Sequence, residues 1–384
     1  MLSKNDNELL TRVGPGTPMG NLFRQYWLPA LMSRELPEPD GAPLRVRLLG
    51  EDLVAWRNTD GTIGVMQNAC PHRGASMFFG RNEENGLRCV YHGWKFDTEG
   101  NCVDMPNEPA ESNFKHKIHA TAYRAAEWGG LIWVYMGPAD LQPELPQMEW
   151  MLVPASHRII SRCHQSSNWV QAVEGGIDSS HVSFLHSTVA SHAPQAEAAR
   201  GLFAVDKAPE FRVAPTDFGL LIGARRKVNE QEDYWRVTPF VLPTYTVIPN
   251  PRQMGSGFFV LPMDDEHSWW FTISESPRPD RPGTPPYVEL QPGTWKQTRN
   301  LCNDYLLDRE MQRTVNYSGL PTNRVQDAAV TETMGPVMDR TKEHLASADL
   351  AIIFMRRMLL RLARQLDQGV EPELLQHPEW HRVK

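Results

Sequence analysis

The sequence has no uninterrupted apolar run of the roughly 18 residues that a membrane-spanning helix needs. Its N-terminus, MLSKNDNELLTRVGPGTPMG, has no basic segment followed by a long apolar stretch, so we expect no secretory signal. Cysteine is scarce: five occur in 384 residues, and an odd number in so long a chain argues against a disulfide framework. These absences predict a cytoplasmic protein without a membrane partner.

An excess of positive charge is also absent, because the formal net charge at pH 7 is −7. Without a basic field, nucleic acid is not an expected partner. The chain has no internal repeat and no low-complexity tract. What it does have is 31 prolines and 12 tryptophans, which favour a loop-rich fold with large aromatic surfaces over a helical bundle.

Turn signals and residue alternation divide the chain into two parts. Short strand-like runs separated by turns extend from Pro43 to Gly137 and predict a small antiparallel β domain. Residues 137–154 carry four prolines without periodicity and are typical of a connection. Beyond it we expect a helix, several strands and a helical C-terminal third. The predicted fold is α+β, with domains at residues 1–140 and 141–384.

The first domain contains two cysteine–histidine pairs, Cys70-x-His72 and Cys89-x-x-His92, each in a loop beside a strand-like run. Two thiolates and two imidazoles on neighbouring loops suit a tetrahedral zinc site. They also suit a [2Fe–2S] cluster that has two cysteines on one iron and two histidines on the other. One cysteine and one histidine in each loop favour the cluster, and zinc remains the alternative.

The second domain begins with a segment, residues 168–186, that reads as a helix with a polar stripe. The stripe comprises Gln171, Glu174, Asp178 and His181. His186 lies five residues beyond His181, so the helix should end or bend between them. Two imidazoles that converge with a carboxylate form the ligand set of a 2-His-1-carboxylate iron site. A solvated helix face with two unrelated histidines is the alternative interpretation.

The stretch CPHRGASMFFGRNEENGLRCVYHGWKFD resembles the Rieske motif. From LLTRVGPGTPMGNLFRQYWLPA to TMGPVMDRTKEHLASADLAII, the chain resembles the alpha subunits of Rieske non-haem iron ring-hydroxylating oxygenases, in particular the phthalate 4,5-dioxygenase-like group. This resemblance implies an N-terminal Rieske [2Fe–2S] domain with antiparallel strands. It also implies a larger catalytic domain of the helix-grip type, with an antiparallel sheet, helices and a mononuclear iron.

The resemblance assigns a role to each residue of the Rieske motif. Cys70 and Cys89 correspond to the ligands of the inner iron of the cluster. His72 and His92 correspond to the ligands of the outer, reducible iron.

The resemblance assigns roles in the second domain as well. His181 and His186 match the histidine ligands of the mononuclear Fe(II). Asp178 matches the aspartate that connects the two metal centres across a subunit boundary, where it bonds a mononuclear-site histidine and a Rieske histidine of the neighbouring subunit. By position these histidines are His181 and His92.

The third iron ligand is expected from a helix far downstream. The segment VQDAAVTETMG resembles the part of the family that supplies it, with Asp327 in the position of the ligand. Asp327 lies among apolar residues, where a buried carboxylate needs a metal or another partner. A carboxylate near a helix N-terminus is the structural alternative, and Glu332 is the second candidate ligand. Asp304 and Asp308, in a charged segment, are expected to be solvated or ion-paired.

The two centres imply a terminal oxygenase that uses O2, two electrons and two protons. We expect cis-dihydroxylation of an aromatic carboxylate, phthalate-like or benzoate-like, in aromatic hydrocarbon catabolism. Monooxygenation, or O-demethylation of a methoxylated acid, is the alternative outcome. The resemblance implies a flavin/iron–sulfur reductase that passes electrons from NAD(P)H, and a homotrimer or a hexamer of stacked trimers.

Two other functions remain open at this point. A Rieske electron carrier with a binding domain would have the cluster without the mononuclear iron, and a zinc-binding module would have neither. Basic side chains near predicted strands could bind a substrate carboxylate, although strand arginines usually face solvent. These candidates are Lys207, Arg225, Arg226, Lys227 and Arg236. We expect the strand FVLPTYTVIPNP and the loop 187–200 to line the pocket.

Overall fold

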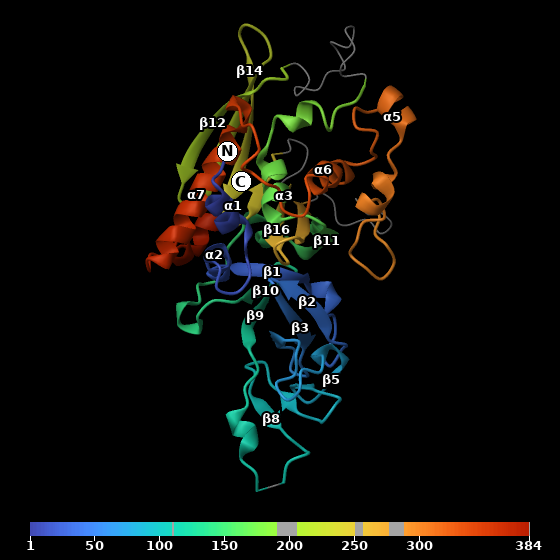
Figure 1. Cartoon of the computed structure of the whole chain (residues 1–384), viewed down its shortest axis with the longest axis vertical. Coiled ribbons are helices and arrows are strands. Elements are labelled where there is room, and N and C mark those ends of the chain that lie inside the picture. Colours follow the sequence, from blue (N-terminus) through green and yellow to red (C-terminus); the bar gives the residue numbers. More distant parts are fainter. Residues whose placement is uncertain (110, 190–205, 250–255, 276–287, 384) are drawn as a thin grey trace. The chain divides into compact units, whose positions relative to one another are not determined.

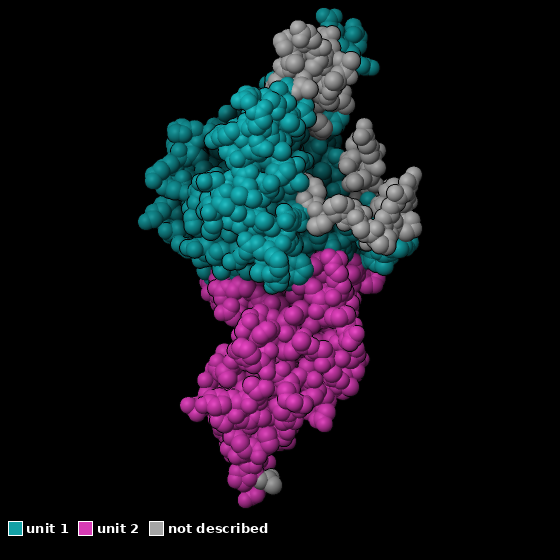
Figure 2. Space-filling model, turned by 90° about the vertical axis from the view of Figure 1, so that its right-hand side faces the viewer, with its two compact units in different colours: residues 1–12, 17–19, 147–384 teal, residues 13–16, 20–146 magenta. Residues whose placement is uncertain are grey.

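The computed structural model describes residues 1–109, 111–189, 206–249, 256–275 and 288–383 (Figure 1). Two compact units are coloured in Figure 2. The N-terminal unit comprises Val13–Gly16 and Gly20–Pro146, and the C-terminal unit comprises Met1–Arg12, Thr17–Met19 and Gln147–Lys384. The sequence led us to expect the chain's first residues in the N-terminal domain, whereas in the structure Met1–Arg12 group with the C-terminal unit.

The N-terminal unit contains two antiparallel sheets. The six-stranded sheet has the order β1-β10-β9-β4-β3-β2, and the four-stranded sheet has the order β5-β6-β7-β8. The strands are β1 (Trp27–Met32), β2 (Leu44–Leu48), β3 (Glu51–Arg57), β4 (Ile63–Gln67), β5 (Arg81–Asn82), β6 (Leu87–Arg88), β7 (Lys95–Phe96), β8 (Cys102–Asp104), β9 (Ala122–Trp128) and β10 (Leu131–Tyr135). Strand β10, with the sequence LIWVY, is buried along its whole length, as a central strand should be.

The C-terminal unit is organised around a seven-stranded antiparallel sheet with the order β11-β17-β16-β15-β14-β13-β12. The strands are β11 (Arg158–Gln165), β12 (Glu210–Thr216), β13 (Gly219–Lys227), β14 (Asp233–Val241), β15 (Tyr245–Val247), β16 (Ser256–Pro262) and β17 (Ser268–Glu275). The α-helices among the described residues are α1 (Lys4–Thr11), α2 (Pro18–Arg24), α3 (Trp169–Ile177), α5 (Arg309–Thr314), α6 (Asn323–Glu332) and α7 (Leu350–Asp367).

Helices α3 and α7 pack against this sheet. Helix α3 packs against β15, β16 and α6, while α7 packs against β12 and α1 (Figure 1). Helix α3 begins where the Asn168 side chain accepts a hydrogen bond from the Val170 N–H, which satisfies one of the free donors of the first turn. The predicted α+β class, with an antiparallel sheet and helices in the larger part, is therefore confirmed.

Some predicted elements are wrong in extent. The helix expected over residues 168–186 ends at Ile177, so it is half as long as the polar stripe suggested. The segment 300–314 is not one helix, because Asp304, Tyr305 and Leu306 have φ values between 48° and 56°, the left-handed region. Cys302 is exposed. Among the described residues, no helix combines the length and the apolar character that crossing a membrane requires.

The two adjacent glycines of α3 meet different surroundings. A Cβ added at Gly176 would lie 2.2 Å from Phe258 Cζ, and that ring is stacked on Trp270 with centroids 4.1 Å apart. A Cβ added at Gly175 would meet Thr331 Cγ2 at 3.5 Å, an ordinary contact. Position 176 is thus the point where the helix approaches the sheet too closely for any side chain.

We predict that Gly176→Ala lowers the free energy of unfolding by about 1–3 kcal/mol, because the Phe258 ring cannot move without breaking its stack. Gly175→Ala is the matched control, and it should be neutral or stabilise by up to about 1 kcal/mol, since alanine favours a helix. Urea denaturation of both variants measures the difference. Equal stability of the two would contradict the close approach at position 176.

Candidate metal centres

The two cysteine–histidine loops of the N-terminal unit share one backbone conformation. In each loop the cysteine N–H donates to the carbonyl five residues later, and the cysteine carbonyl accepts from the glycine N–H four residues later. The pairs are Cys70–Ala75, Gly74–Cys70, Cys89–Trp94 and Gly93–Cys89, at 2.8–2.9 Å. The C-x-H and C-x-x-H spacings therefore fold into equivalent loops.

A glycine closes each loop for a steric reason. Gly74 and Gly93 have φ values of +76° and +80°, which are strained for residues with a Cβ. At Gly93 a Cβ would also lie 2.6 Å from Pro106 Cγ. These glycines let the chain turn tightly enough to bring each cysteine and its histidine to the same end of the loop.

The four side chains are sorted by type. The Cys70 and Cys89 thiols are buried and interact with each other. Burial raises the pKa of the Cys70 thiol to about 11. The neighbouring Cys89 adds to this rise, and a hydrogen bond from the backbone of His72 opposes it. The His72 and His92 rings meet edge to face with centroids 4.4 Å apart. Thiol beside thiol and imidazole beside imidazole is the arrangement that a Rieske cluster needs, whereas a zinc ion needs all four to converge on one point.

Two observations indicate that a metal group fits these loops. The Nδ1 atom of His72 is buried without a hydrogen-bond partner, which leaves its lone pair available as a ligand. Trp94 stacks on the same ring at 4.3 Å and 12°, and its Nε1–H donates to Asn107 Oδ1 at 2.7 Å, so the indole keeps the imidazole in one orientation. A thiol with a raised pKa releases its proton when a metal binds.

The segment after α3 presents the other two histidines. Asp178 caps the helix, and its Oδ1 accepts a hydrogen bond from Ser180 N–H at 2.6 Å, a local bond that competes with helix continuation. A single 3₁₀ turn, His181–Ser183, follows, and His186 lies after it. Ending the helix early is what allows two histidines five residues apart to face the same point.

His181, His186 and Asp327 form the one trio of ligand-type side chains that converges among the described residues. The His181 and His186 Nε2 atoms are 3.0 Å apart, and Asp327 Oδ1 lies 3.1 Å from His186 Nε2 and 3.8 Å from His181 Nε2. Two donors about 2.1 Å from a metal, about 90° apart, are separated by about 3.0 Å. Two of the three separations therefore match ligands on one face of an octahedron, and the third, at 3.8 Å, is wider.

Gln326 supports this trio and was not predicted from the sequence. Its Oε1 lies 2.6 Å from His186 Nδ1, and its Nε2 donates to the Leu320 carbonyl at 2.9 Å, which fixes which end of the amide faces the ring. His186 Nδ1 must then carry the proton, and Nε2 keeps its lone pair for a metal. Burial lowers the pKa of His186, but hydrogen bonds with Asp327 and Gln326 outweigh it and the net shift is upward.

Asp178 lies beside the trio. Its Oδ2 is 3.4 Å from His181 Nδ1, close enough for an ion pair but outside good hydrogen-bond geometry, and that nitrogen has no hydrogen-bond partner. Both side chains are 23% exposed. The carboxylate can therefore accept a further hydrogen bond from outside the C-terminal unit.

The other acidic candidate on α6, Glu332, has different partners. Its carboxylate accepts hydrogen bonds from Tyr305 Oη and from Ser166 N–H, the latter at 2.9 Å. With both oxygens used and only 4% of the residue exposed, Glu332 stabilises the fold and does not belong to the trio. The geometry favours Asp327 as the third ligand.

Asn168 and Glu174, which belong to the segment 168–186, have contacts away from the trio. The Asn168 amide donates to the carbonyls of Thr11 at 3.0 Å and Asp265 at 2.6 Å. Glu174 is buried against Arg340 and Arg356, as described in the Discussion. Neither side chain reaches the trio.

The five basic candidates for binding a carboxylate are not equivalent. Arg225 is ion-paired with Glu210 and Asp233 at the surface, and Lys227 is exposed at the end of β13. Arg226 is fully buried and donates to the Ser179 carbonyl at 2.6 Å, so it stabilises the turn before His181.

Arg236 differs because its charge acts on the trio. The neighbours of Arg236 on β14, Trp235 and Val237, are exposed, so Arg236 lies on the opposite, inner face together with the buried Thr238 and Phe240. Burial is the main factor that lowers the pKa of His186 against the net upward shift, and the positive charge of Arg236 adds to it, so Arg236 lies near His186. Burial lowers the pKa of Arg236 itself. Lys207, the remaining candidate, lies with its Nζ 5.7 Å from the centre of the Phe184 ring.

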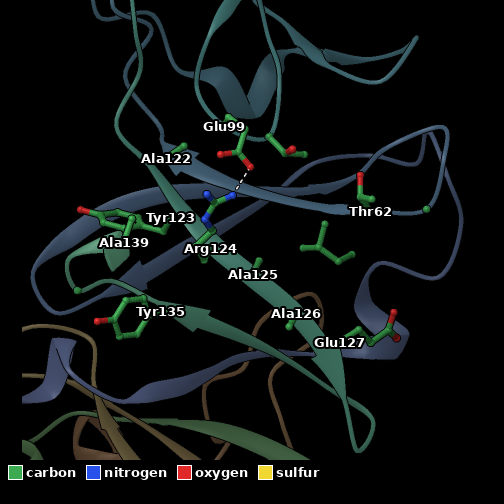
Figure 3. A pocket seen from close by; sticks show the side chains of 14 residues that line it. Thr62, Glu99, Ala122, Tyr123, Arg124, Ala125, Ala126, Glu127, Tyr135 and Ala139 are labelled. Carbon is green, nitrogen blue, oxygen red and sulfur yellow. Dashed lines mark hydrogen bonds and ion pairs between the residues drawn. The ribbon is translucent and has the colours of Figure 1, made fainter. Parts of the chain in front are cut away.

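The predicted pocket lining is only partly described. Of the loop 187–200, residues 190–200 lie outside the described residues, as do the last two residues of the predicted strand 240–251. A hollow of about 520 Å³ does occur on the N-terminal unit, lined by β9, β10, Thr62 and Glu99 (Figure 3). Glu99 and Arg124 form an ion pair across it. None of the predicted metal ligands lines this hollow, so it is separate from both centres.

Comparison with known proteins covers both units. Residues 26–122 match the Rieske [2Fe-2S] domain, and residues 134–378 match the family described as LigXa C-terminal domain like. The oxygenase subunit of 3-chlorobenzoate-3,4-dioxygenase from Comamonas testosteroni is 41% identical over 95% of this chain and 89% of its own length. The oxygenase subunit of phthalate 4,5-dioxygenase from Pseudomonas putida is 40% identical over 94% and 86%.

A more distant relative and a solved structure are also similar to this chain. The oxygenase subunit of 5,5'-dehydrodivanillate O-demethylase from a Sphingobium species is 32% identical over 98% of this chain and 84% of its own length. The crystal structure of dicamba monooxygenase bound to dicamba superposes with a TM-score of 0.64 at 19% identity, covering 90% of this chain and 99% of the other. The structural likeness supports the fold alone.

Replacement of the two acidic residues of α6 separates their roles. We predict that Asp327→Asn lowers the affinity of the trio for Fe(II) by at least about 100-fold, more than a typical change beside a ligand, because a neutral amide replaces the anionic donor. Glu332→Gln is the matched control: it should lose about 1–3 kcal/mol of stability and keep the iron.

Iron analysis together with the visible absorbance of the cluster measures both effects in one sample. The cluster should persist in both variants. If Glu332→Gln lost the mononuclear iron and Asp327→Asn kept it, Glu332 would be the third ligand and Asp327 would not.

Proposed function

Because the chain belongs to the family of Rieske oxygenase subunits, we propose that it is the terminal oxygenase that hydroxylates an aromatic carboxylate with O2 and electrons from a NAD(P)H-dependent reductase. The observation that carries the proposal is the convergence of His181, His186 and Asp327 in a chain that also has paired thiols and paired imidazoles. The first donor set fits a mononuclear iron and the second fits a Rieske cluster.

The residues around each group prepare it for its task. When bound, the cluster supplies electrons one at a time, and the mononuclear iron supplies the activation of O2. His181, His186 and Asp327 would hold the iron and would leave coordination positions open for O2. Gln326 keeps His186 in the tautomer that turns Nε2 toward the metal, and Asp178 has the corresponding position beside His181 Nδ1.

We infer that Arg236 binds the carboxylate of the substrate. The relatives at 40% and 41% identity are named for phthalate and 3-chlorobenzoate, both aromatic carboxylates. Arg236 is on the inner face of β14, and its charge acts on His186, so a carboxylate paired with it would hold an aromatic ring near the trio. A guanidinium can bind a carboxylate through two parallel hydrogen bonds, which fixes the orientation of the ring as well.

Cis-dihydroxylation is the reaction we propose, since both relatives at 40% and 41% identity are named dioxygenases. Monooxygenation with O-demethylation is the second candidate, and it is favoured by one observation, the 32% identity to an O-demethylase subunit. A Rieske electron carrier is disfavoured, because such a protein would not require the spacing of the trio.

We also infer that electrons cross between subunits through Asp178, in a homotrimer or in a hexamer of stacked trimers. The half-buried Asp178 carboxylate can accept a second hydrogen bond from a neighbouring chain. On the N-terminal unit, Val90 and Tyr91 are 57% and 56% exposed beside the Rieske histidines, as apolar side chains at a protein interface are before assembly. A flavin/iron–sulfur reductase is the proposed electron donor.

The substrate proposal is tested by a panel of phthalates, benzoates and methoxybenzoates with a surrogate reductase, and the products are scored as diol, phenol or formaldehyde. Arg236→Met should raise KM for the carboxylates by roughly 10–100-fold, the value of a lost charge-assisted pair. Arg225→Met, at the surface, is the matched control and should behave as the wild type. Turnover of no carboxylate in the panel would refute the substrate assignment, and an unchanged KM in Arg236→Met would refute the role of Arg236.

Asp178→Asn tests the route of the electrons. We expect unchanged iron content and cluster absorbance, with the reoxidation of the reduced cluster by O2 and substrate slowed at least about tenfold. Asp264→Asn is the matched control, because Asp264 lies 2.9 Å from His267 Nδ1 in the same i,i+3 relation, away from the trio. Wild-type reoxidation in Asp178→Asn would exclude Asp178 from the electron route.

A further inference from the structure

The two elements that carry the trio are distant in sequence. His181 and His186 follow α3, whereas Asp327 lies within α6, about 140 residues later. The ligand spacing of 3.1 Å between His186 Nε2 and Asp327 Oδ1 therefore depends on how α3 and α6 are held against each other. The two helices pack directly, and Gly175 is one point of contact, since Thr331 Cγ2 lies 3.5 Å from where its Cβ would be.

The Gln171 side chain occupies the interface between these helices. It is 1% exposed, and its Nε2 donates to the carbonyls of Thr331 and Gly335, each at 2.9 Å. Its Oε1 accepts from Met338 N–H, also at 2.9 Å. The three hydrogen bonds of the Gln171 amide therefore all go to the C-terminal end of α6 and to the residues just after it.

This contact has a clear physical origin. The last carbonyls of a helix have no partner within the helix, and Thr331 is the residue before the last in α6. Gln171 supplies a donor from another helix for that carbonyl. This hydrogen bond is stabilising because, without the Gln171 amide, the buried Thr331 carbonyl would have no partner.

The contact continues from Thr331 to the ligand residue itself. Thr331 Oγ1 donates to the Asp327 carbonyl at 2.6 Å, one turn earlier in the same helix. The same oxygen accepts from Gln165 Nε2 at 3.0 Å, and Gln165 lies at the end of β11, just before α3. Gln171 and Gln165 thus hold the two ends of one threonine, whose hydroxyl bonds the backbone of Asp327.

We propose that Gln171 is a positioning residue that sets α6 against α3 and thereby sets the distance of Asp327 from the two histidines. The proposal rests on the proposed function, because it takes the trio as the iron site. Gln171 touches no ligand atom, so it acts through Thr331. Its loss should change the geometry and affinity of the trio while the Rieske cluster, in the other unit, stays intact.

The test compares two amide-to-acid substitutions on one helix. In Gln171→Glu the carboxylate faces the carbonyls of Thr331 and Gly335, and in Asn168→Asp it faces those of Thr11 and Asp265. Each variant loses a buried amide donor to two backbone carbonyls. The side-chain hydrogen bonds of Asn168 go to Thr11, Asp265 and Val170, and its backbone N–H, which donates to the Pro336 carbonyl after α6, is kept in Asn168→Asp. The pair therefore separates general destabilisation from a shift of α6.

The variants are purified with their clusters, depleted of mononuclear iron and titrated with Fe²⁺ and, separately, with Co²⁺. We expect similar losses of Tm in both variants. Gln171→Glu alone should bind Fe²⁺ at least about tenfold more weakly, the scale of a lost support next to a ligand. It alone should shift the visible bands of bound Co²⁺, which report the arrangement of the ligands.

Thr331→Val keeps the experiment decisive if Gln171→Glu does not fold, because it removes the hydroxyl between Gln165 and Asp327 without adding a charge. It should reproduce the weaker Fe²⁺ binding and the Co²⁺ shift. Wild-type metal binding in Gln171→Glu or in Thr331→Val, or equal changes in Asn168→Asp, would overturn the proposal. If the wild-type protein and all variants bound no metal at the trio, the proposed function would fail instead.

Discussion

Three polar ligand atoms meet within 3.8 Å in the C-terminal unit although they come from segments about 140 residues apart. Two imidazoles and a carboxylate held this close together need a shared partner such as a metal, and a backbone that keeps them in place. The packing of α3 against α6 provides the second of these. Helix α3 ends at Ile177 so that His181 and His186 can face one point, and α6 brings Asp327 to it.

Helix α3 is also part of a buried ion network. Glu174, one turn before Asp178, accepts hydrogen bonds from Arg340 at 3.0–3.1 Å and from Arg356 at 2.6 Å, and Arg356 also binds both oxygens of Glu343. Burial alone would raise the pKa of Glu174, but the two guanidinium groups outweigh it and the net shift is downward. A network with every charge paired favours one arrangement over others, because removing any partner leaves a buried charge unpaired. Arg340 also reaches Asn7 of α1, which explains why the first residues of the chain belong to the C-terminal unit.

Sequence reasoning succeeded where local pattern and chemistry coincide. The two C–H loops were predictable because the residue types and their spacing define the donor set, and the α+β class followed from alternation and turns. Asp327 was preferred over Glu332 by resemblance, and the structure explains the preference because Glu332 is used by Tyr305. Gln171 and Gln326 were not recognised as supports. Gln171 was seen only as part of a polar stripe, and Gln326 only as a neighbour of Asp327, because their partners lie at sequence separations of 160 and 140 residues. The trimer and the cytoplasmic location stay predictions.

The central claim is that one chain holds two separate iron centres, one in each unit. Anomalous diffraction from crystals of the protein, measured just above and just below the iron absorption edge, locates iron atoms without reference to activity. The account predicts two peaks per chain: one among Cys70, His72, Cys89 and His92, and one among His181, His186 and Asp327. A peak at the loops alone, in crystals grown with excess Fe²⁺, would contradict it.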